Sequence, residues 1–145
     1  MLEVKPATDN DIPALLELIH EFQAESLDEY NLFCDDEVAK AVMPVYIPNT
    51  LVLLKDGYII GVIAGTIVKY PLSNEDTFQE AIWYVTKDFR KYGIKLLREL
   101  ERRCKDNGIK NIVMVHLGDS KSEKLERFYK KCGYRMCEIQ YIKKL

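Results

Sequence analysis

The apolar residues are spaced as in β-strands in the middle of the chain and as in a helix further on. Residues 50–54 and 58–68 are apolar, β-branched runs joined by Asp56-Gly57, a dipeptide that suits the positive φ angles of a tight hairpin. Residues 93–106 instead carry apolar side chains at helical spacing along one broad face. Strands that first pair locally and then alternate with helices favour a mixed sheet with helices on both faces.

The predicted elements follow the order β-α-α-β-β-β-α-β-α-β. Strands are expected at residues 2–6, 50–54, 58–68, 78–86, 109–116 and 135–143. Helices are expected from Thr8 or Asp9 to Phe22, at 35–43 before Pro44, at 93–106, and from the Ser120-x-x-Glu123 capping box to Lys131. We therefore predict an α/β fold of one domain, residues 1–145, with about six to seven strands in the central sheet. The strand–helix–strand unit at residues 80–116 should pair in parallel, with a right-handed crossover.

Composition argues against several classes of protein. The formal net charge of -2 and the pI near 5.8 do not suggest a nucleic-acid binder, which usually carries a basic face. The four cysteines form no C-x-x-C pair, and the two histidines complete no metal-finger pattern, so we expect reduced thiols and no metal. No apolar run approaches the roughly 20 residues that cross a bilayer, and the first residues lack the apolar stretch of a signal peptide. These features predict a cytoplasmic protein with no membrane partner.

Residues 82–97 read as a strand, a short basic turn with a glycine, and a helix. Unpaired amides at a helix N-terminus are a ready site for phosphate, and Arg90, Lys91 and Lys95 add positive charge there. Gly93 would let the backbone approach an anion closely. On these residues alone the plainer alternative, a solvated basic helix start with a turn glycine, is the more common outcome.

Residues 122–134 read as a capped helix that ends at Gly133. Phe128 should face the core. The neighbouring Tyr129 offers a phenol whose ordinary pKa is near 10. The alternative for Tyr129 is a half-buried packing residue.

Taken together, these two stretches resemble the GNAT superfamily of acetyl-CoA-dependent N-acetyltransferases. The family pattern is a strand, R/Q-x-x-G-x-G/A and a helix, followed by N-x-x-A-x-x-F-Y-x-K-x-G-F/Y. The second part is present here as Ser122-x-x-Leu125-x-x-Phe128-Tyr129-x-Lys131-x-Gly133-Tyr134. In the first part, Arg90-Lys91-Tyr92-Gly93 has one glycine where the family usually has two or three. The ending Glu138-x-x-Tyr141-x-Lys143 also looks like that of small bacteriophage members.

The resemblance implies acetyl-CoA as the acyl donor and an amine as the acceptor, both bound before transfer. The pantetheine arm would lie in a splay between the strands at 82–86 and 110–116. The pyrophosphate would sit on residues 90–95. The residues expected to contact acetyl-CoA are Trp83, Tyr84, Val85, Arg90, Lys91, Tyr92, Gly93, Ile94, Lys95, Ser122 and Phe128.

The resemblance also assigns catalytic candidates. Tyr129 matches the family's catalytic tyrosine and would protonate the leaving thiolate. Glu80, at the start of the donor strand, would take the amine proton, although an exposed strand-end carboxylate is the alternative. His116 could accept a proton near neutral pH, although a histidine that caps a strand end is the alternative. A backbone N–H near Tyr84 or Val85 would polarise the thioester carbonyl.

The sequence thus predicts acetyl transfer to a primary amine on a small molecule or a protein. An acidic segment would favour a cationic acceptor, although an ordinary solvated loop is the alternative; its residues are Glu25, Asp28, Glu29, Asp35 and Asp36. A different hypothesis is a catalytically inactive GNAT-like module that binds a protein partner, such as an inhibitor of a host factor. Ile139 and Ile142 on the last predicted strand could support a homodimer.

Overall fold

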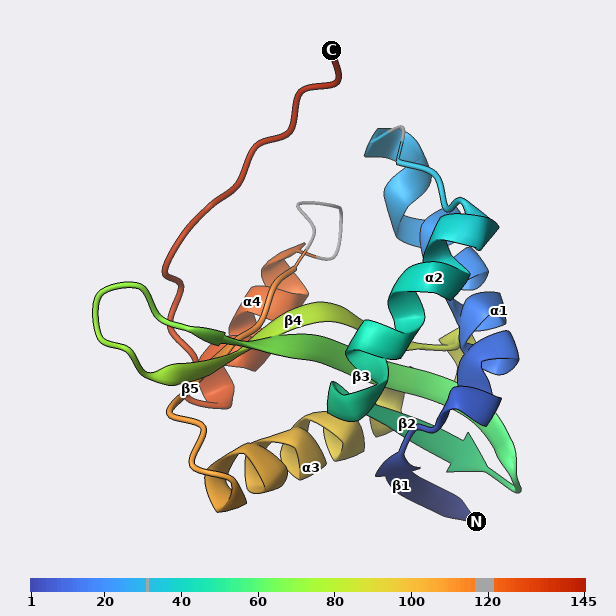
Figure 1. The fold of residues 1–145 in the computed structure, drawn as a ribbon, viewed down its shortest axis with the longest axis horizontal. Helices are drawn as coiled ribbons and strands as arrows, with labels where there is room; N and C mark the ends of the chain where they lie inside the picture. The colour runs from blue at the N-terminus through green and yellow to red at the C-terminus, as the bar shows by residue number, and fades with distance from the viewer. Residues whose placement is uncertain (31, 117–121) are drawn as a thin grey trace.

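The structure, a computed structural model, describes residues 1–30, 32–116 and 122–145, apart from the side chains of Glu29 and Ser122. One mixed sheet lies at its centre, with the strand order β1-β2-β3-β4-β5 (Figure 1). Its strands are β1 (Leu2–Pro6), β2 (Thr50–Lys55), β3 (Tyr58–Lys69), β4 (Asp76–Val85) and β5 (Asn111–Val113). The α-helices of the described residues are α1 (Ile12–Phe22), α2 (Asp36–Tyr46), α3 (Gly93–Asp106) and α4 (Ser122–Lys131).

Helices cover both faces of the sheet because strands β2 and β3 are apolar on both sides. Leu53 and Ile63 belong to the cluster that packs with α3, whereas their neighbours Val52 and Val62 belong to the cluster that packs with α1 and α2. All four of these side chains are buried. The helices accordingly lie on opposite sides of the sheet, with α3 on one side and α1 and α2 on the other (Figure 1). The predicted α/β layering is confirmed.

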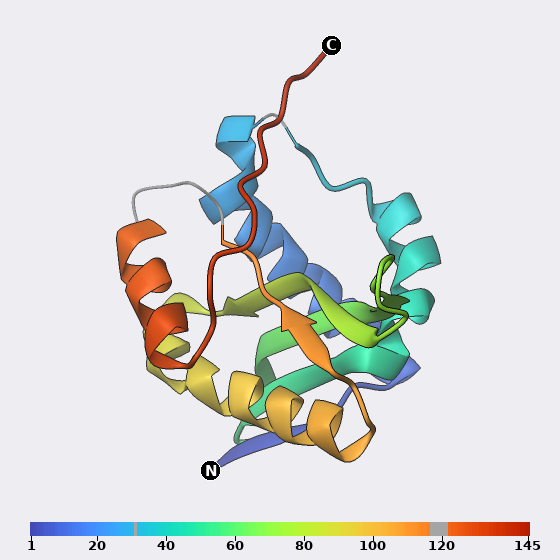
Figure 2. The same ribbon diagram turned by 90° about the vertical axis from the view of Figure 1, so that its left-hand side faces the viewer.

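The predicted count of about six to seven strands is wrong, because the sheet formed by the described residues has five. Residues 135–143 form no strand, and the C-terminal end extends beyond the body in both views (Figures 1 and 2). Strand β5 is also shorter than the predicted 109–116. Alternating side chains favour a strand only where the backbone finds a neighbour to pair with, and the described residues provide none for this segment. The second helix also continues through Pro44 to Tyr46, past its predicted end.

Strand β4 is irregular where it passes Gly65. Ala64 pairs with Ile82 and Gly65 pairs with Glu80, so Ala81 is an extra residue that forms a bulge. A Cβ at Gly65 would lie 2.2 Å from the carbonyl oxygen of Gln79, so only glycine permits this close approach. The bulge changes the direction of β4 at the position of Glu80.

Strands β4 and β5 part soon after they meet. Their parallel ladder pairs residues 77–79 with residues 111–113, and β5 ends there. Strand β4 continues to Val85 with β3 on one edge and no strand on the other among the described residues. The predicted parallel pairing is confirmed, and the separation opens a gap in the sheet beside residues 80–85.

The central position of Phe78 predicts a large effect of truncation. Phe78 is 1% exposed beneath α3, and Phe78→Ala should lower the free energy of unfolding by about 3–5 kcal/mol because a cavity remains. Phe33→Ala is the matched control, since Phe33 is 72% exposed and its loss should cost about 0.5 kcal/mol or less. Denaturant unfolding measures both, and equal losses would contradict the assignment of the core.

Candidate active site

Glu80 lies in the sheet where β5 has ended, and its carboxyl group is buried. The residue is 7% exposed, the backbone N–H of Val115 donates to its carboxyl group, and Oε2 has no hydrogen-bond partner among the described residues. Burial raises the pKa of Glu80 to about 8, and the Val115 hydrogen bond offsets part of that rise. The alternative of an exposed carboxylate is therefore wrong. Glu80 is a buried carboxyl group that can change its charge near neutral pH.

Tyr129 of α4 reaches the same place from the other side of the gap. Its hydroxyl donates to the carbonyl oxygen of Val115 at 2.9 Å. Burial, followed by the charge of Glu80, raises its pKa above the ordinary value for tyrosine. Val115 therefore connects the two side chains, with its N–H on Glu80 and its carbonyl on Tyr129. Tyr129 keeps its proton and acts as a hydrogen-bond donor.

Aromatic rings surround the Tyr129 phenol. The ring of His116 stacks on Tyr129 at a centroid distance of 6.3 Å and an angle of 16°. Trp83 lies 5.9 Å from Tyr129 and Tyr134 lies 5.6 Å from it. The three candidate catalytic residues, which are far apart in the sequence, thus come together where β4 and β5 separate.

The side chains of Trp83 and Tyr84 point to opposite faces of the sheet. Trp83 packs 5.9 Å from Phe128, on the side of α3 and α4. Tyr84 is buried on the side of α1, where its hydroxyl donates to Glu21 at 3.3 Å and its ring meets Phe22 edge-on. Burial, followed by nearby carboxylates, raises the pKa of Tyr84 to about 12. A single ligand in the gap could therefore contact both Trp83 and Tyr84 only through their backbone groups.

Arg90 is occupied by other residues of the protein. Its guanidinium forms an ion pair with Glu25, and its Nε donates to the carbonyl oxygen of Val85 at 3.3 Å. The guanidinium also lies 5.8 Å from the centre of the Tyr84 ring. The sequence predicted Arg90 as a mobile positive charge at a helix start, whereas here it joins β4 to the segment that follows α1.

Gly93 stands at the junction between a 3-10 helix and α3. A 3-10 helix (Lys87–Tyr92) leads directly into α3, and the N–H of Gly93 donates to the carbonyl of Arg90. Gly93 is buried, and a Cβ there would lie 3.4 Å from Val85 and 3.6 Å from Trp83. Both distances are ordinary van der Waals contacts, so packing alone does not require glycine at this position.

The remaining residues of this turn differ in how far their side chains are exposed to solvent. Lys91 and Lys95 are exposed, and the Lys91 ammonium lies 5.0 Å from the centre of the Tyr92 ring. Ile94 packs against the core on the α3 side. Ser122 begins α4, but its side chain lies outside the described residues, as does Ser120 of the predicted capping box. The positive charge at the start of α3 therefore comes from Lys91 and Lys95.

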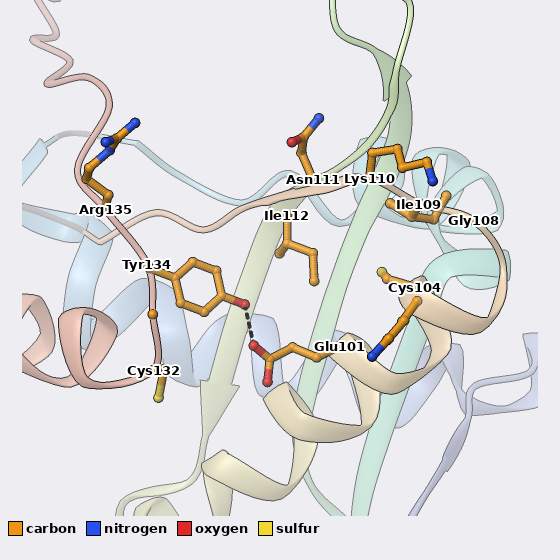
Figure 3. Close-up of a pocket in the computed structure, with 12 residues that line it drawn as sticks. Glu101, Cys104, Gly108, Ile109, Lys110, Asn111, Ile112, Cys132, Tyr134 and Arg135 are labelled. Carbon is orange, nitrogen blue, oxygen red and sulfur yellow. Dashed lines mark hydrogen bonds between the residues drawn. The ribbon is translucent and has the colours of Figure 1, made fainter.

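A separate hollow lies along the outer edge of β5 (Figure 3). It has a volume of about 610 Å³ and is lined by residues from α3, β5 and the segment after α4. At its floor the hydroxyl of Tyr134 donates to Glu101 at 3.1 Å. None of the three catalytic candidates lines this hollow, so it is distinct from the gap between β4 and β5.

Sequence reasoning missed the part played by Val115 and Tyr134. Val115 acts through its backbone, and a backbone group has no residue type that a motif could identify. Tyr134 was present in the second motif, but its contact with Glu101 depends on how the chain returns toward α3. Such contacts follow from tertiary packing alone.

The chain matches a known family over most of its length. Residues 13–134 match the family described as Acetyltransferase (GNAT) family, and the chain belongs to it. The GNAT resemblance expected from the sequence is confirmed, while the narrower likeness to bacteriophage members stays a prediction. No helix of the described residues is long and apolar enough to span a membrane. The chain matches no curated protein sequence.

Solved acetyltransferase structures share the fold. A ribosomal-protein-alanine N-acetyltransferase from Brucella melitensis biovar Abortus 2308 is 16% identical, with a TM-score of 0.77 over 99% of both chains. An aminoglycoside acetyltransferase from an uncultured soil metagenomic sample is 17% identical, with a TM-score of 0.75 over 100% of this chain and 99% of that one. An acetyltransferase from Trypanosoma brucei is 21% identical, with a TM-score of 0.71 over 100% of both chains. At these identities the likeness establishes the fold alone.

Burial of Glu80 predicts an unusual dependence of stability on pH. Because the folded protein raises its pKa from an ordinary 4.5 to about 8, its contribution is fully present below about pH 4.5 and is lost as the pH rises to about 8. Unfolding in urea at several pH values should show a loss on the order of a few kcal/mol that Glu80→Gln removes. Glu138→Gln, at an exposed carboxylate, should keep the wild-type profile. A wild-type profile as flat as that of Glu80→Gln would contradict the burial argument.

Proposed function

We propose that this protein transfers an acetyl group from acetyl-CoA to a primary amine, with both substrates bound together. The observation that supports this is the meeting of a buried carboxyl group, Glu80, and a buried phenol, Tyr129, at the gap between β4 and β5. A proton acceptor and a proton donor held together are what transfer between an amine and a thioester needs. Membership of the acetyltransferase family supports the same reaction class.

The described residues fit an acyl donor in this gap. Beyond residue 79, the edge of β4 that faces β5 has no partner strand among the described residues, so its backbone groups can pair with an extended amide chain. Lys91 and Lys95 would hold the diphosphate beside the start of α3. The N–H of Gly93 is already bonded to Arg90, so these lysines would supply a larger share of the attraction than backbone amides do. Acetyl-CoA, when bound, supplies the activated acetyl group as a thioester.

Each catalytic residue then has one task. The amine nitrogen forms a bond to the acetyl carbon as the carbon–sulfur bond breaks, and the electron pair of that bond stays on sulfur. Glu80 accepts the proton that the amine loses, for which a pKa of about 8 is well matched near neutral pH. Tyr129 donates its hydroxyl hydrogen to the sulfur as negative charge develops there. Because burial makes this phenol a weaker acid, a hydrogen bond to sulfur is the main part of its contribution.

Glu80 is favoured over His116 as the base. Oε2 of Glu80 is buried without a hydrogen-bond partner among the described residues, and such an oxygen is suited to a substrate proton. The His116 ring is nearly parallel to the Tyr129 ring, with the two centroids 6.3 Å apart, and this arrangement would help to hold the phenol in place. His116 would therefore position Tyr129.

The acidic segment after α1 gives weaker support for a cationic acceptor than the sequence suggested. Glu25 is neutralised by Arg90, Asp35 caps α2 by accepting from two backbone amides, and Asp36 pairs with His20. Three of the five acidic residues of the segment thus already have partners within the protein. Related structures are described as acting on an aminoglycoside and on a ribosomal protein alanine, which are small-molecule and protein amines respectively. We propose a primary amine of either kind and a screen that includes both.

Replacement of the phenol tests the mechanism. Tyr129→Phe should lower kcat by about 10²-fold or more, with little change in acetyl-CoA affinity, because only the proton donor is lost. Tyr134→Phe is the matched control, since it removes a neighbouring hydroxyl that bonds to Glu101 instead. Steady-state rates of thiol release measure both variants. A Tyr129→Phe enzyme as active as Tyr134→Phe would overturn the assignment.

Charge removal tests donor binding. Isothermal titration with acetyl-CoA should show affinity that falls by roughly tenfold or more in a Lys91→Ala/Lys95→Ala variant, because two charges near the diphosphate are removed. Lys143→Ala/Lys144→Ala removes the same charge from the exposed chain end and should bind as the wild type does. No binding to the wild-type protein at about millimolar acetyl-CoA would overturn the proposal and favour an inactive binding module.

A further inference from the structure

Three side chains that can bind a metal lie close together where α1 ends and α2 begins. Within the described part of the chain, His20, Cys34 and Asp36 place one ligand atom each within 4.8 Å of one another. Nε2 of His20 lies 2.8 Å from Oδ1 of Asp36, and the Cys34 thiol donates to the same oxygen at 3.8 Å. An imidazole, a thiol and a carboxylate thus meet around one small space.

Local hydrogen bonds hold these ligands in position. The backbone N–H of Cys34 donates to the side-chain oxygen of Gln23 at 2.6 Å, which ties the segment before α2 to the end of α1. Asp35 accepts from the amides of Glu37 and Val38 and so performs the capping of α2. Asp36 is not needed as the cap, and its carboxylate turns instead to His20. The three ligands therefore come from segments that other contacts already fix.

The cluster borders a second hollow. A space of about 510 Å³ lies between α1 and α2, and its lining includes both His20 and Asp36. Figure 1 shows that these helices run side by side on one side of the sheet. His20 and Asp36 are exposed and Cys34 is half-buried, so an ion can reach them from solvent. Water can reach a coordination position that the protein leaves open.

We propose that His20, Cys34 and Asp36 bind a zinc ion, with water as the fourth ligand. Nitrogen, thiolate sulfur and carboxylate oxygen are all ligands of Zn²⁺, and three protein ligands with one open position are a common tetrahedral arrangement. A thiolate in the set argues against Mg²⁺ and Ca²⁺, which prefer oxygen alone. The ion would join the end of α1 to the start of α2, close to the helical turn Gln23–Leu27 that carries Glu25, the partner of Arg90.

Cobalt is the spectroscopic probe of this site. The full-length protein, reduced and treated with a chelator, should bind one equivalent of Co²⁺ and show the visible bands of tetrahedral cobalt and a thiolate-to-cobalt charge-transfer band. Zn²⁺ should displace the cobalt. Cys34→Ser should lose the charge-transfer band, and its zinc affinity should fall by about 100-fold or more, because a ligand is removed. Cys137→Ser, at an exposed cysteine outside the cluster, should keep both.

Thermal unfolding gives a second readout that does not depend on activity. Saturating Zn²⁺ should raise the Tm of the wild-type protein by roughly 5 °C and leave Cys34→Ser and Asp36→Asn unchanged. A charge-transfer band that survives in Cys34→Ser, or that disappears in Cys137→Ser, would overturn the proposal. Failure of the wild-type protein to bind either metal would overturn it equally, and would mean that His20 and Asp36 form an ion pair only.

Discussion

Strands β4 and β5 share three residue pairs and then separate, and the proposed active site depends on this separation. A sheet that stayed paired would use the backbone groups of residues 80–85 in its own ladder. The bulge at Ala81, which the absence of a side chain at Gly65 permits, turns β4 at the same place. Within the described residues, the edge of β4 beyond residue 79 therefore has no partner strand, and in the proposed function an extended ligand chain would pair there without breaking the sheet.

The two buried titratable groups at this gap influence each other. The charge of Glu80 raises the pKa of Tyr129, so a Glu80 that has gained a proton makes the phenol a better donor. Both groups bond to the backbone of Val115, which therefore connects them. In this arrangement, transfer of a proton to Glu80 and donation by Tyr129 would support one another. Burial of Glu80 lowers the free energy of unfolding at high pH. The same burial gives the site a carboxyl group whose pKa of about 8 lies near neutral pH.

The sequence by itself determined much of the secondary structure and the family. Apolar runs, the Asp56-Gly57 turn and the amphipathic residues 93–106 predicted the hairpin of β2 and β3 and the helix α3. Local patterns suffice there because period and turn chemistry are properties of neighbouring residues. The second motif carried Tyr129, which the structure places beside Glu80. The number of strands was overestimated because alternation along residues 135–143 does not create a partner for them.

Only the tertiary structure decided how the candidate residues act. It buried Glu80, which sequence position alone could equally have left in solvent. It paired Arg90 with Glu25 in an ion pair, so the positive charges of the turn that are left for a ligand are those of Lys91 and Lys95. Burial, pairing and the shared backbone of Val115 are contacts between segments that lie far apart in the chain. A linear pattern specifies which groups are present, whereas pKa values and partners depend on which groups the fold brings together.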